Sequence, residues 1–194
     1  MRGTGRSGII IALLVVFTGG LSTAQWEEKP PLRDRIFFGG NIGLQFGTIT
    51  NIEVSPLVGI YLTPRLAMGP GIKYEYYKSN YPGFVPFETH IYGGAVFARY
   101  MVIRDLSEAI GLGLNMGIFG HTEYEILSLE RKYFEVGAPL QAEGRFNLHS
   151  ILIGGGIYQS IGRRAGFLIM ILWNLNETAS SPYSNPILRI GFNF

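Results

Sequence analysis

Apolar and polar residues alternate with a period of two along most of the chain beyond residue 34. In residues 110–118 (IGLGLNMGI) every second residue is large and apolar, and the residues between are glycine or asparagine. The same alternation runs through residues 187–194 (ILRIGFNF). Successive side chains of a β-strand point to opposite faces, so this period predicts strands with one apolar and one polar face.

Eight such segments follow one another, each bounded by glycine, proline, asparagine or serine. They span residues 35–46, 52–61, 66–77, 90–102, 110–125, 148–158, 165–176 and 187–194. Most are 8–13 residues long, which suits a tilted strand that crosses a bilayer with about 9–11 residues. Their number is even, as in bacterial single-chain barrels. The pattern predicts an all-β fold, an eight-stranded antiparallel up-and-down transmembrane β-barrel.

The connections between these segments alternate in length. The short ones are residues 62–65, 103–109 and 159–164, and the long ones are residues 78–89, 127–147 and 177–186. Short periplasmic turns and long outer loops are typical of outer-membrane barrels, although the short connection 47–51 departs from the trend. We expect both chain ends in the periplasm, and residues 127–147 to prolong the flanking strands as a hairpin.

Charged residues share the glycine-bearing face of several segments, which predicts that this face is the interior. These residues are Lys73, Glu75, Arg99, Glu123, Glu125 and Arg189. An eight-stranded barrel is just wide enough for side chains to fill it, and buried charges must be paired. We predict a polar network in the lumen made of Lys73, Glu75, Arg99, Glu123 and Arg189. Such a network either holds the barrel together or forms a binding or proton site.

Aromatic residues gather near the predicted strand ends, where membrane barrels carry interfacial girdles. They are Tyr74, Tyr76, Tyr77, Tyr81, Tyr92, Tyr100, Trp173 and Tyr183. The alternative interpretation is the ordinary enrichment of aromatic residues in strands.

The first 24 residues have the three parts of a secretory signal peptide. Arg2 and Arg6 precede the apolar run 9–17, and small residues lead to a predicted cut between Ala24 and Gln25. The apolar run is shorter than the roughly 18 residues of a membrane-spanning helix. The predicted organisation is a signal peptide (1–24), a periplasmic tail (25–34) and an outer-membrane barrel (35–194).

Composition supports this picture and excludes several functions. Charged residues make up 15% of the chain, against about 25% in soluble domains. Without Arg2 and Arg6 the chain has 14 basic and 14 acidic residues, so it has no basic patch that would bind nucleic acid. It has no cysteine, and its histidines are far apart in sequence, so we expect neither a disulfide, a metal site nor a cofactor.

The last ten residues, NPILRIGFNF, resemble the C-terminal insertion signal of outer-membrane barrels, with Leu188, Ile190, Phe192 and the final Phe194 as its apolar positions. This resemblance implies recognition by the barrel-assembly machinery. Residues 154–165, 172–176 and 181–186 resemble small, mostly uncharacterised outer-membrane barrel proteins of Bacteroidota. That resemblance covers residues 35–194 and implies an OmpX-like barrel without catalytic residues.

Four functions fit the sequence. The first is a structural or surface-interaction barrel that contacts lipids and, through its loops, protein partners. The second is an enzyme that modifies lipid or lipopolysaccharide, with His121 and Glu123 on one face but no evident serine partner. The third is an accessory subunit of an outer-membrane secretion or assembly complex, docked by its N-terminal tail. The fourth is a soluble lipocalin-like barrel, which would need an apolar lumen.

Overall fold

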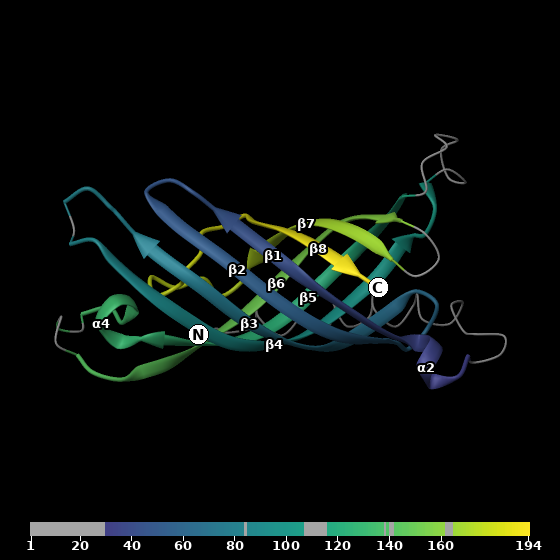
Figure 1. The fold of residues 1–194 in the computed structure, drawn as a ribbon, viewed down its shortest axis with the longest axis horizontal. Helices are drawn as coiled ribbons and strands as arrows, with labels where there is room; N and C mark the ends of the chain where they lie inside the picture. Colours follow the sequence, from purple (N-terminus) through teal and green to yellow (C-terminus); the bar gives the residue numbers. More distant parts are fainter. Residues whose placement is uncertain (1–29, 84, 107–115, 138, 140–141, 162–164) are drawn as a thin grey trace, which may run out of the picture.

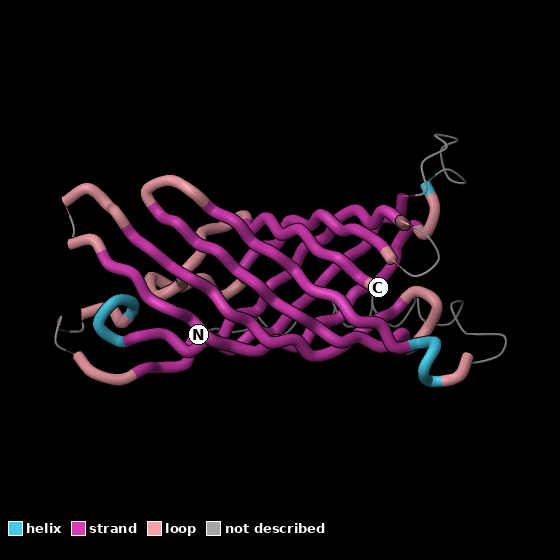
Figure 2. The backbone as a smooth tube through the Cα atoms, in the orientation of Figure 1, coloured by secondary structure: helices cyan, strands magenta, loops and turns pink. Residues whose placement is uncertain are grey.

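The structure is a computed structural model and describes residues 30–83, 85–106, 116–137, 139, 142–161 and 165–194. Eight strands dominate it: β1 (Ile36–Gln45), β2 (Ile49–Tyr61), β3 (Leu66–Ser79), β4 (Phe87–Ile103), β5 (Met116–Glu130), β6 (Arg145–Ser160), β7 (Gly166–Asn174) and β8 (Ile187–Asn193). Two single-turn helices, α2 (Leu32–Arg35) and α4 (Arg131–Phe134), accompany them. The strands run obliquely along the long axis, with α4 at one end and α2 and the C-terminus at the other (Figures 1 and 2).

The eight strands form a closed antiparallel barrel in the order β1 to β8. Each strand pairs with the next one along the chain, and β1 closes the ring on β8 from Gly39 opposite Asn193 to Ile42 opposite Ile190. This confirms the eight-stranded antiparallel up-and-down fold. The barrel end that carries α2 and the C-terminus is called the terminal end below, and the end that carries α4 is called the loop end.

The largest departures from the predicted boundaries occur in β5 and β6. Strand β5 continues to Glu130 and β6 begins at Arg145, so much of the predicted loop 127–147 is a hairpin headed by α4. We expected this prolongation of the hairpin, but not its helical turn. The predicted start of the fifth strand, residues 110–115, lies outside the described residues, as do the signal peptide and its cleavage site between Ala24 and Gln25.

Glycines let neighbouring strands approach closely at positions where a side chain would collide with backbone. A Cβ atom on Gly156 would lie 2.0 Å from the carbonyl oxygen of Ile169, and one on Gly154 would lie 2.0 Å from that of Ile171. The glycine run of β6 therefore has a packing role against β7.

The interior combines polar and apolar side chains. Residues Leu168, Met170 and Leu172 of β7 point inward and are buried, so this wall of the lumen is apolar rather than polar. Tyr77 and Tyr183 are also buried inside, which contradicts their assignment to an outer girdle, whereas Tyr74, Tyr81, Tyr92 and Trp173 are exposed as expected. No helix in the described ranges has the length and apolar character needed to span a membrane.

Candidate functional site

Five charged side chains meet across the middle of the lumen, and we call them the central cluster. They are Glu53 of β2, Lys73 of β3, Glu123 and Glu125 of β5, and Arg189 of β8. Every one of these side chains is at most 5% exposed. The period of two aims each of them inward from its strand, and closure of the barrel brings the four strands together around them.

Lys73 and Arg189 bridge the three carboxylates. The Lys73 Nζ lies 3.5 Å from Glu53 Oε1 and 3.3 Å from Glu123 Oε1, and it also pairs with Glu125 Oε2. The Arg189 guanidinium lies 3.1 Å from both Glu53 Oε2 and Glu123 Oε1, and 3.7 Å from Glu125 Oε2. A buried ion pair is tolerated when the remaining lone pairs are satisfied as well.

Neutral donors complete the hydrogen bonding of the three carboxylates. Ser55 Oγ donates to Glu53 Oε1 at 2.5 Å, His121 Nε2 lies 3.2 Å from Glu123 Oε2, and the Tyr183 hydroxyl donates to Glu125 Oε1. All six carboxylate oxygens of the central cluster therefore have a donor. Among the donors, Arg189 Nη2 makes no hydrogen bond within the described ranges, so the network is satisfied on its acceptor side.

Two residues of the predicted lumen network lie outside this cluster. Glu75 is buried beside it, opposite Glu53 in the sheet, and accepts a hydrogen bond from Asn51 Nδ2 at 3.2 Å. Arg99 lies toward the terminal end, between the rings of Phe97 and Phe119. The structure thus joins Lys73, Glu123 and Arg189 of the predicted set by ion pairs, and Glu75 and Arg99 take no part in these pairs.

Glu53 and Glu125 belong to the cluster although the predicted network omitted them. Both lie on the same inward face as their neighbours, two residues from Ser55 and Glu123 respectively, so the alternation already contained this signal. What the sequence lacks is the register between strands, which decides which inward charges are level with one another.

Tyr183, in the loop between β7 and β8, covers the cluster from the loop end. Its ring lies 5.7 Å from Lys73 Nζ, and its hydroxyl reaches Glu125. Further toward α4 the interior is filled by apolar side chains, including Leu127, Leu129 and Phe134. These side chains and those of the central cluster are buried inside the described part of the barrel.

The three histidines occupy different places. His121 is buried against Glu123, and its Nδ1 has no hydrogen-bond partner among the described residues. His90 and His149 are on the outer face, where each is hydrogen-bonded to a tyrosine hydroxyl at 2.8 Å. No group of three or more His, Cys, Asp or Glu residues in the described ranges is arranged to hold a metal ion.

No family model matches the chain, and no curated protein matches it. Among solved structures it is similar to the N-terminal β-barrel domain of Pseudomonas aeruginosa OprF, with 12% identity and a TM-score of 0.45 over 82% of this chain and 96% of that one. It is also similar to a de novo designed transmembrane β-barrel, with 12% identity and a TM-score of 0.39 over 87% of this chain and 98% of that one. Likenesses this distant assign neither family nor function, so we argue function from the chain's own residues.

Proposed function

We propose that the protein is an integral outer-membrane β-barrel with a side-chain-filled lumen and a structural or surface-interaction role. The observation that carries this proposal is an apolar outer surface around a charged interior. Each strand contributes exposed apolar side chains, for example Phe38, Val54, Ile72, Val96, Ile126, Ile153, Ile171 and Leu188. Soluble monomers rarely expose such a continuous apolar surface, whereas membrane barrels carry an outward apolar band.

The loop end of the outer surface has the chemistry of a membrane boundary. Outward-facing charged residues such as Lys78, Glu88 and Arg145 lie near the ends of their strands. The Arg145 guanidinium lies 5.4 Å from the ring centroid of Tyr92, and the Tyr74–His90 pair lies on the neighbouring strands. Amphipathic aromatic side chains of this kind favour the level of the lipid headgroups.

The orientation and export route are parts of the same proposal. Long loops of membrane barrels face outward and short turns face the periplasm, so α4 would lie outside the cell and both chain ends in the periplasm. Residues 1–24 would direct export and be removed before Gln25. The apolar C-terminal side chains Leu188, Ile190, Phe192 and Phe194 face outward, where the barrel-assembly machinery would reach them.

The head of the hairpin between β5 and β6 favours a surface-interaction role. The rings of Phe87 and Tyr133 stack with centroids 4.2 Å apart, and Phe134 packs edge-on against Tyr77. A loop fixed by this packing presents a preformed surface and loses little entropy when a partner binds. The OmpX-like family and a Bacteroidota source belong to this proposal as well.

The alternatives differ in what they require. An enzyme would need a nucleophile beside His121, but the buried Ser150 lies opposite Glu125, four residues along the sheet from the position opposite His121. That separation is about 13 Å at the rise of a strand.

An accessory subunit would co-purify with its complex from gently solubilised membranes, whereas a structural barrel would not.

Two measurements test the proposal. Membrane fractionation should recover the protein in the outer membrane, with a gel mobility that shifts on boiling as a folded barrel unfolds. The purified protein in planar bilayers should show no stable conductance, because the central cluster and Tyr183 fill the lumen. A protein that stays in the soluble periplasmic fraction without a mobility shift would reject the membrane assignment, and a large stable conductance would reject the closed lumen.

A further inference from the structure

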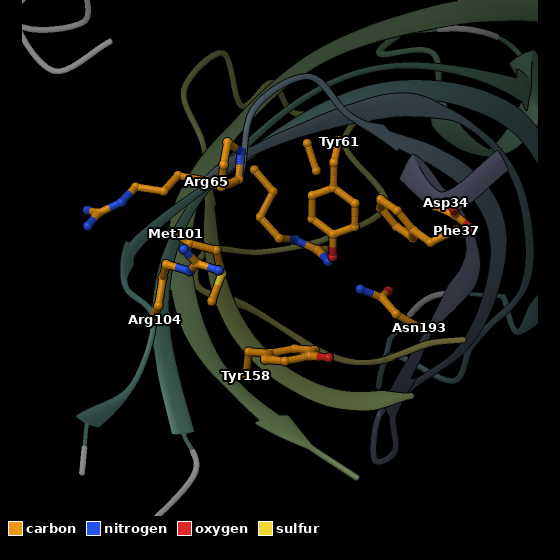
Figure 3. A pocket seen from close by; sticks show the side chains of 11 residues that line it. Asp34, Phe37, Tyr61, Arg65, Met101, Arg104, Tyr158 and Asn193 are labelled. Atoms are coloured by element: carbon orange, nitrogen blue, oxygen red, sulfur yellow. The ribbon is translucent and has the colours of Figure 1, made fainter. Parts of the chain in front are cut away.

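The terminal end of the barrel contains a cavity of about 370 Å³, and no residue of the central cluster lines it. Its walls include Phe37, Tyr61, Arg99, Met101, Tyr158 and Asn193. Figure 3 shows the ring ends of Tyr61 and Tyr158 and the side chain of Asn193 directed toward the middle of this cavity. Its volume is at the lower end of the range typical of small-molecule sites, roughly 300–1,000 Å³.

Arg99 is a buried cation that lines this cavity without a hydrogen-bond partner. The residue is only 4% exposed, and within the described ranges neither its Nε nor its two Nη atoms make a hydrogen bond. A buried charge without a partner is costly, so a position of this kind indicates a missing counter-charge. None of the carboxylate oxygens of the central cluster is hydrogen-bonded to Arg99, and each of them has another donor.

The surroundings of Arg99 fix its guanidinium and leave its donors available. The Cζ atom lies 5.5 Å from the ring centroid of Phe97 and 5.0 Å from that of Phe119. Aromatic rings attract a guanidinium through its charge and its flat faces, and they accept none of its in-plane N–H groups. The N–H fork is thus held in place by apolar neighbours, as in a preformed anion site.

The cavity favours a singly charged ligand with an apolar body. Asp34 and Arg104 also line the cavity and carry opposite charges. Arg65 contributes to the wall as well, but Figure 3 shows its guanidinium directed away from the cavity, and it donates to the Val102 carbonyl at 3.4 Å. One buried fork matches the planar geometry of a carboxylate. The rings of Phe37 and Tyr61 and the side chain of Met101 offer apolar contact to the rest of the ligand.

We propose that this cavity binds a small monocarboxylate, with its carboxylate on Arg99 and the hydroxyls of Tyr61 and Tyr158, and its aromatic or short aliphatic body against Phe37 and Met101. In the membrane orientation proposed above, the cavity opens to the periplasm. The binding itself does not depend on that orientation, so a failure to bind would leave the membrane assignment untouched.

The test is a titration of the full chain, folded in detergent micelles, with benzoate. Calorimetry should give saturable binding, and the arginine Nε–H resonance that is lost in Arg99→Met should shift with benzoate. Arg99→Met should weaken binding by roughly 10- to 100-fold, the effect of losing a charge-assisted hydrogen-bonded pair. Arg131→Met, which removes an arginine at the loop end, should leave the affinity unchanged.

A second variant keeps the test decisive if Arg99→Met does not fold. Replacing both tyrosines (Tyr61→Phe with Tyr158→Phe) retains the cation and should weaken benzoate binding by about tenfold through the lost hydroxyl donors. Absence of saturable benzoate binding, or equal binding by wild type and Arg99→Met, would overturn the proposal. Tighter binding of phenyl phosphate than of benzoate would overturn the assignment to carboxylates.

Discussion

Lys73, like Arg189, contacts all three carboxylates of the central cluster. Lys73→Met would leave these buried carboxylates with Arg189 as their single cationic partner. Removing one partner of a buried ion network leaves uncompensated charge, which costs about 3–5 kcal/mol of unfolding free energy. Urea unfolding in lipid vesicles, followed by tryptophan fluorescence, measures this change.

The surface pair of Lys132 with Glu130, 3.2 Å apart, provides the control. Lys132→Met should leave the unfolding midpoint unchanged, because solvent screens an exposed pair. Glu125→Gln added to Lys73→Met removes one of the carboxylates left short of a partner, so the double variant should be more stable than two independent losses would give. Strict additivity would show that Lys73 and Glu125 do not act as one network.

Tyr183 contributes to stability through a single buried hydroxyl. Tyr183→Phe keeps the ring beside Lys73 but leaves Glu125 Oε1 without its donor. An unsatisfied buried acceptor costs about 1–3 kcal/mol, and the same urea titration should report a loss of this size. Tyr92→Phe, at an exposed ring on β4, is the matched control and should change little. If the two variants change the free energy of unfolding equally, the hydrogen bond from Tyr183 to Glu125 does not contribute to stability.

At the scale of elements, alternation predicted the faces of the strands better than it predicted their ends. The assignment of Lys73 and Arg189 to the interior required only the period of two. The sequence could not predict the position of Tyr183, because loops have no periodicity and their path depends on tertiary contacts. The helical turn α4 was not predicted for a related reason, because four residues are too few to establish a period of 3.6.

The sequence also could not predict which charged residues pair with one another. Arg99 and Glu123 share the inward face of neighbouring strands, yet in the sheet Arg99 lies opposite His121, and Glu123 pairs with Lys73 of β3, two strands away. Register and closure, both non-local, decide between such outcomes. The period of two therefore yields a list of inward charges, and only the folded barrel separates the central cluster from Glu75 and Arg99.

The glycine run of β6 gives a prediction at this scale. A methyl group at Gly156 would lie 2.0 Å from the Ile169 carbonyl oxygen, so Gly156→Ala must push β6 and β7 apart. We expect a loss of roughly 1–3 kcal/mol, as for other overpacked sites, seen as a lower temperature at which the gel mobility shifts. Gly120→Ala is the matched control, because its methyl would meet its nearest atom only at 4.0 Å. If both variants shifted at the same temperature, the close approach of β6 and β7 at Gly156 would be contradicted.

At the scale of the whole molecule, the decisive feature is the reversal of the usual arrangement of charge. Glu53, Lys73 and Arg189 are inside, while Ile72 and Leu188, neighbours of two of them in sequence, are exposed. Burying charge is costly, and exposing apolar surface to water is costly as well. In the membrane location proposed above, lipid around the barrel would relieve the second cost, and the ion pairs of the central cluster relieve the first.

Ile72, in the middle of β3, tests this account directly because 67% of its surface is exposed. Ile72→Arg would place a cation against hydrocarbon if the outer surface faces lipid, at a cost of about 2–4 kcal/mol near the bilayer midplane. Urea titration in lipid vesicles should show this loss. Val136→Arg, an equally exposed apolar position beyond α4, should show none, because it would lie in water. In a water-soluble barrel both substitutions would be tolerated alike, and that result would require a different environment for the apolar surface.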